Sequence, residues 1–107
     1  MNREAFTDML MKEGFPDAVL VTREANVAME VHTHPFEAKA LIVEGEIRIR
    51  VGDEERLYRV GDVFHLPGHE AHAEQYGPRG VTYLVGRKGK RSAAFRRLSS
   101  GNGTTRY

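Results

Sequence analysis

Between residues 18 and 85, apolar and polar side chains alternate with a period of two. The clearest example is the segment 46–51, where Ile47, Ile49 and Val51 lie on one side and charged residues on the other. Such alternation is typical of β-strands that bury one face. It predicts strands over eight segments, which are 18–23, 27–31, 38–43, 46–51, 56–60, 63–66, 71–76 and 81–85.

Short turn sequences separate these predicted strands. Each contains glycine, next to an acidic residue or a proline, and they are Glu44-Gly45, Gly52-Asp53, Gly61-Asp62, Pro67-Gly68 and Gly77-Pro78. These residues favour the backbone angles of tight turns. Many short strands at intervals of about eight to twelve residues favour an all-β sandwich or barrel over alternating strands and helices.

The first residues follow a helical period instead. Phe6, Met9 and Leu10 recur at helical spacing and Gly14 ends the pattern, so a short helix is predicted over residues 2–13. The segment 38–43 is apolar on both faces, so its outer face needs a cover. We expect this cover to come from the N-terminal segment, residues 1–16, or from a second subunit.

Composition and charge indicate a single domain followed by a basic C-terminal segment. Its 107 residues suffice for one domain, and we expect a barrel over residues 17–86. Residues 1–86 carry nine basic and fifteen acidic side chains, a net charge of −6, whereas residues 87–107 carry seven basic side chains and no acidic one. We call residues 87–107 the basic tail and expect it to be flexible. It lacks interleaved aromatic residues, so nucleic-acid binding is not expected.

The chain contains no cysteine, which excludes disulfides and thiolate chemistry. No apolar run approaches the roughly 20 residues that span a bilayer, and the charged N-terminus does not resemble a signal peptide. We therefore expect a cytoplasmic protein without membrane contact.

Three histidines are the strongest candidates for chemistry. His32 and His34 are two residues apart at the end of a predicted strand, so their side chains can lie on one face. His72 follows a Pro-Gly turn. Imidazoles that converge can bind a transition metal. The alternative is a hydrogen-bonded polar pocket without metal.

The sequence resembles the cupin family in two motifs. Residues 32–45 resemble the first motif, His-x-His followed by a spaced glycine, and residues 61–72 resemble the second, in which Gly-Asp leads to a proline and a histidine. The resemblance implies a double-stranded β-helix, a jelly-roll barrel, with a short N-terminal helix. It also implies His32, His34 and His72 as ligands of a divalent transition metal (Zn, Fe, Ni or Mn).

Two positions depart from the family pattern. Ala38 stands where the first motif has a glutamate ligand, and strand alternation turns the neighbouring Glu37 away from the histidines. His69 replaces a glycine of the second motif, and we expect Gly68 to adopt the special backbone angle instead. His65 is expected on the outer face.

Glu74 is the candidate catalytic residue. It follows His72 by two positions, so a regular strand directs it into the same cavity. It could move a proton, act as a fourth ligand or orient a histidine. We expect Tyr76 and Tyr83 to pack in the core or place a hydroxyl at the cavity edge.

The resemblance also bounds the function. It implies a metal-binding protein that binds or acts on a small polar molecule, either as an oxygenase, lyase or isomerase, or as a non-catalytic sensor or binding module. Small members of the family are commonly dimers, so a homodimer is expected.

Overall fold

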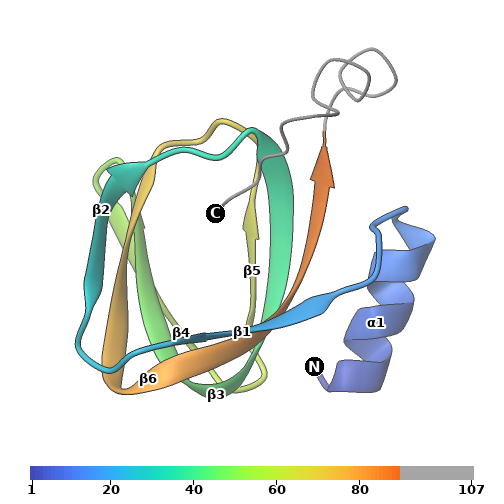
Figure 1. The fold of residues 1–107 in the computed structure, drawn as a ribbon, viewed down its shortest axis with the longest axis horizontal. Helices are drawn as coiled ribbons and strands as arrows, with labels where there is room; N and C mark the ends of the chain where they lie inside the picture. Colours follow the sequence, from blue (N-terminus) through green and yellow to red (C-terminus); the bar gives the residue numbers. More distant parts are fainter. Residues whose placement is uncertain (90–107) are drawn as a thin grey trace.

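Two long antiparallel strands, β3 (Phe36–Val51) and β6 (His72–Gly89), form the frame of the molecule. The computed structural model describes residues 1–89. Every other strand pairs with one of these two, and together they form a six-stranded sheet that curls into a barrel (Figure 1). The remaining strands are β1 (Val19–Arg23), β2 (Ala28–His32), β4 (Glu54–Arg59) and β5 (Val63–Leu66).

The two long strands distribute their partners between their halves. The first half of β3 pairs with β5 and with the second half of β6, which also carries β1. The second half of β3 pairs with β4 and with the first half of β6, which also carries β2. This arrangement confirms the predicted all-β jelly-roll fold.

Two of the predicted turns are wrong. Glu44-Gly45 and Gly77-Pro78 lie inside β3 and β6, so four predicted strands are in fact two. The register shifts on either side of Gly45, whose φ is 71°, and Gly80 nearby has a φ of 76°. A Cβ on Gly45 would overlap the carbonyl oxygen of Gly80. The glycines therefore bend two continuous strands against each other, as β-bulges do, instead of reversing the chain.

The interior of the barrel is apolar. Ile47 and Ile49 are buried on the inner side of β3, while Arg48 and Arg50 between them are exposed, as the alternation predicted. The other members of this core come from strands β3, β5 and β6: Ala38, Ala40, Ile42, Phe64, Leu66, Tyr76, Val81, Tyr83 and Val85. The two tyrosines are core residues, as expected.

Helix α1 (Arg3–Lys12) covers the outside of the barrel (Figure 1). The Asn2 side chain accepts a hydrogen bond from the Ala5 N–H at 2.8 Å and so caps the helix. Phe6 and Leu10 are buried against Leu41, on the outer face of β3. The apolar outer face of this segment is therefore covered by the N-terminal helix of the same chain.

The end of the described chain is still strand. Arg87 and Lys88, which the sequence assigned to the basic tail, belong to β6. Lys88 Nζ donates a hydrogen bond to the Glu13 carbonyl at 2.6 Å. The rest of the tail, residues 90–107, lies outside the described residues. Within residues 1–89 no helix is long and apolar enough to cross a membrane.

Candidate functional site

The three predicted histidines meet at one end of the barrel. His32 ends β2, His72 begins β6, and His34 lies in the segment that leads into β3. The ring centroids are 4.4 Å apart for His32 and His72, 4.9 Å for His32 and His34, and 5.1 Å for His34 and His72. One nitrogen from each ring lies within 4.8 Å of the others, a spacing that small ring rotations would close around a single ion.

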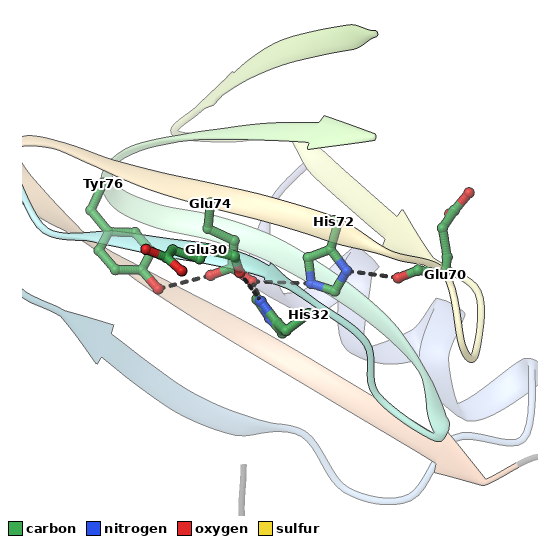
Figure 2. Close-up of polar contacts among 6 residues, drawn as sticks. All are labelled: Glu30, His32, Glu70, His72, Glu74 and Tyr76. Atoms are coloured by element: carbon green, nitrogen blue, oxygen red, sulfur yellow. Dashed lines mark hydrogen bonds and ion pairs between the residues drawn. The ribbon is translucent and has the colours of Figure 1, made fainter. Parts of the chain in front are cut away.

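Backbone carbonyls orient two of the rings (Figure 2). His32 Nδ1 lies 2.7 Å from the Glu30 carbonyl oxygen, and His72 Nδ1 lies 2.9 Å from that of Glu70. A carbonyl only accepts hydrogen bonds, so each Nδ1 carries the proton and donates it. In the neutral ring, Nε2 then presents its lone pair to the cavity, which is the arrangement of metal-binding histidines.

The surroundings of those two Nε2 atoms show whether the residues fit a metal. Both are buried and neither meets the geometry of a hydrogen bond among residues 1–89, although the Glu74 carboxylate lies 3.3 Å from that of His72 and 3.6 Å from that of His32. His72 as a whole is only 2% exposed. A buried nitrogen without a partner is costly, and a metal ion would satisfy both at once. The donor set therefore fits a divalent transition metal.

His34 completes the cluster and is electrostatically suited to remain neutral. Its ring stacks on Phe36 with centroids 4.8 Å apart. Burial, followed by repulsion from His72 and His32, lowers the pKa of His34 to about 4. A neutral imidazole is the form that binds metal.

Glu74 points into the cluster, as its position in the strand predicted (Figure 2). Its Oε2 lies 3.3 Å from His72 Nε2 and 3.6 Å from His32 Nε2, and its side chain is 9% exposed. Its Oε1 accepts a hydrogen bond from the Tyr76 hydroxyl at 2.8 Å. Burial alone would raise the pKa of Glu74, but the contacts with His72 and Tyr76 outweigh it and lower the pKa. For His72, burial is likewise outweighed, and Glu74 raises its pKa.

The positions of the residues around the cluster agree in part with those predicted from the sequence. Ala38 is buried and lines the cavity, whereas Glu37 lies outside and contacts His65 Nε2 at 2.7 Å. The expectation for Gly68 is wrong, because His69 itself adopts the left-handed conformation, with a φ of 64°. This conformation lets the His69 N–H donate to the His34 carbonyl at 2.6 Å, which ties the turn to the site.

A cavity of about 100 Å³ adjoins the histidines, and two arginines line it. Arg23 ends β1 and Arg87 lies near the end of β6. Sequence reasoning missed both residues. The alternation of side chains pointed to both. Arg23 continues the inward positions of Val21, and Arg87 continues those of Tyr83 and Val85. Arg87, however, was assigned to the tail.

Arg23 and the polar residues of the cavity shift one another's pKa values. Burial lowers the pKa of the Arg23 guanidinium. Its electrostatic interaction and hydrogen bond with Tyr83, followed by its interactions with Tyr76 and Glu74, outweigh burial, so the net shift raises the pKa. Burial, with Glu74 as the next cause, raises the pKa of Tyr83. The Arg23 guanidinium and the Glu74 carboxylate are therefore charged, while Tyr83 stays neutral.

Comparison with solved structures identifies the fold independently. An RmlC-like cupin from Shewanella frigidimarina NCIMB 400 is 25% identical, with a TM-score of 0.59, and the match covers 70% of this chain and 67% of that one. KdgF from Halomonas sp. is 23% identical, with a TM-score of 0.58 and coverage of 72% and 73%.

A third similar structure is a lyase. The DMSP lyase DddQ from Ruegeria pomeroyi DSS-3 is 27% identical, with a TM-score of 0.62, over 71% of this chain but only 39% of the lyase. The chain thus corresponds to well under half of that enzyme.

Comparison at the sequence level gives the family. A search of curated proteins finds no match. The family model of the cupin domain matches residues 19–75, which is more than half of the chain and includes all three histidines and Glu74. The chain belongs to the cupin family.

Proposed function

We propose that this cupin binds a divalent transition metal through His32, His34 and His72, and binds a small polar molecule in the adjoining cavity. The observation that carries the proposal is the pair of buried Nε2 atoms on His32 and His72, which form no hydrogen bond and are each oriented by a carbonyl at Nδ1. The metal would supply a Lewis acid beside the cavity. Three nitrogen ligands without a thiolate suit Zn, Fe, Ni or Mn.

We further propose that Glu74 moves a proton during turnover. Its Oε2 faces the histidine cluster, while the Tyr76 hydroxyl anchors its Oε1, so one oxygen is positioned and the other is available. Lyase and isomerase reactions that transfer a proton use such a group. The similarity to DddQ, a DMSP lyase, favours the lyase class among them.

Elemental analysis of purified protein tests the metal proposal. We expect close to one equivalent of a transition metal in the native protein and a loss to background in His34→Ala and His72→Ala. His65→Ala is the matched control, because His65 is an exposed histidine of β5 that contacts Glu37. A native metal content below about a tenth of an equivalent after loading, or an equal loss in His65→Ala, would refute the proposal.

We also propose that the protein forms a homodimer and is located in the cytoplasm. Exposed apolar side chains on β1, β2 and the loop between them support a second subunit, and they are Val19, Leu20, Val27, Met29 and Val31. Sedimentation equilibrium would measure the mass in solution, and a monomer at micromolar concentration would contradict the dimer.

A further inference from the structure

The cavity beside the histidines carries two guanidinium groups that metal binding does not use. We propose that Arg23 and Arg87 bind the carboxylate of a small organic acid whose short apolar body fills the rest of the cavity. The inference deepens the proposed function, because it names the ligand class of the same site.

Arg23 provides the clearest evidence. Its side chain lines the cavity beside Tyr83, with which the guanidinium interacts, and its buried Nε makes no hydrogen bond in the described part of the chain. A buried donor on a charged group is costly when it is unpaired. The planar guanidinium matches a carboxylate in geometry, so a carboxylate ligand would pair with the guanidinium nitrogens.

Arg87 lines the same cavity, beside its smallest side chain. Its Cα is paired with that of Ala38 across β3 and β6, so the two side chains lie on one face of the sheet. The guanidinium carbon lies 5.6 Å from the centre of the Phe36 ring, which stacks on His34. Ala38 thus leaves space between a cation and the histidine cluster.

The charge balance of the cavity favours an anion. Arg23 and Arg87 contribute two positive charges, and Glu74 is the acidic residue among the lining side chains. The Glu74 carboxylate already contacts His72 and Tyr76. The lining therefore has a net charge of about +1 with neutral histidines, and a bound divalent metal would add to it.

The remaining lining selects an organic anion over an inorganic one. Phe64, Leu66 and Val85 form apolar walls, together with Phe36 and Ala38. Apolar walls with a few polar groups are typical of sites for organic ligands. The cavity volume of about 100 Å³ favours a small ligand, of about six heavy atoms.

Butyrate and butyramide are a matched pair of probes, since they share shape and size and differ in charge. We would titrate each into the full chain by calorimetry, in metal-free and zinc-loaded protein, with inorganic phosphate as a third probe. Binding to metal-free protein separates this inference from the proposed function, because the arginine contacts do not require the ion.

We expect butyrate to bind metal-free protein at least about tenfold more tightly than butyramide or phosphate, since a charge-assisted hydrogen bond contributes about that factor. Arg23→Gln and Arg87→Gln should each lose about tenfold in butyrate affinity. Arg23→Lys keeps the charge without the fork and should lose less. The control is Arg59→Gln, because Arg59 is 70% exposed on β4, and it should bind butyrate as the native protein does.

Equal binding of butyrate and butyramide would overturn the inference. Tighter binding of phosphate would also overturn it in favour of an inorganic anion site. If Arg23→Gln fails to fold, as judged by circular dichroism, Arg23→Lys and Arg87→Gln still decide, and unchanged butyrate affinity in both would overturn the inference.

Discussion

His32 and His72 occupy directly paired positions on β2 and β6. A shift of register between Met29 and His32 creates this pairing. Met29 pairs with Glu74, so an unbroken ladder would place Val31 opposite His72 and turn His32 to the other face. The irregularity directs His32 into the barrel, and each of the two rings then bonds the carbonyl two residues before it.

Glu74→Gln distinguishes a proton carrier from a metal ligand. Glutamine keeps an oxygen for the Tyr76 hydroxyl and removes the charge. We expect the variant to retain metal within about twofold of the native content, because three imidazoles remain. Elemental analysis alongside His72→Ala provides the measurement. A loss as complete as in His72→Ala would make Glu74 a fourth ligand.

His34 should reduce the stability of the metal-free protein in acid. Its pKa is lowered from 6.5 to about 4 by burial and by its neighbouring histidines. As the pH falls from 6.5 towards 4, the unfolded chain binds a proton at His34 and the folded chain does not, so the free energy of unfolding decreases. Urea unfolding of chelator-treated protein across this range measures the effect.

His34→Ala is the reference for this pH dependence. The raised pKa of His72 acts in the opposite direction, so only the difference between the native protein and the variant isolates His34. We expect a shallower decrease in the variant. Identical pH profiles would show that His34 titrates alike in the folded and unfolded chains.

Replacement of His69 by glycine should stabilise the protein. A non-glycine residue in the left-handed region costs on the order of 1 kcal/mol, and His69 has a φ of 64°. We expect His69→Gly to raise the free energy of unfolding by up to about 1 kcal/mol, and His69→Ala, which retains the strain, to give no increase. A decrease in His69→Gly would show that the imidazole contributes more than its backbone costs.

Gly45 should be the least replaceable glycine of the barrel. An added Cβ would overlap the backbone of Gly80, whereas a Cβ on Gly52 meets nothing within 4 Å. Both have positive φ, at 71° and 60°. We expect Gly52→Ala to cost about 1 kcal/mol for the backbone angle alone, and Gly45→Ala to cost at least about 2 kcal/mol more. Denaturant midpoints would compare them, and equal costs would contradict the close approach.

The helix and the faces of the strands were predictable because each depends on local spacing. Phe6 and Leu10 recur on one side of a helix, and Ile47 and Ile49 recur on one side of a strand, whatever the rest of the chain does. The same rule placed Glu74 on the side of His72. The outer-face position of His65 was predictable for the same reason.

The two wrong turns show where local reasoning ends. Gly45 and Gly77 carry typical turn neighbours, yet both lie inside long strands. A glycine that permits a turn also permits a bend, and the pairing of β3 with β6 on both sides of these glycines decides between them. Likewise, His69 rather than Gly68 took the positive φ because its N–H bonds the distant His34 carbonyl.

The sequence by itself determined which chemical groups exist and on which side of its own element most of them lie, because side-chain direction repeats with the local backbone. Only the tertiary structure decided that the irregularity in β2 places His32 opposite His72, and that Arg23 from β1 reaches the same cavity as Arg87 from β6. Both results depend on register between strands far apart in the chain, and register is set by pairing and burial across the whole barrel.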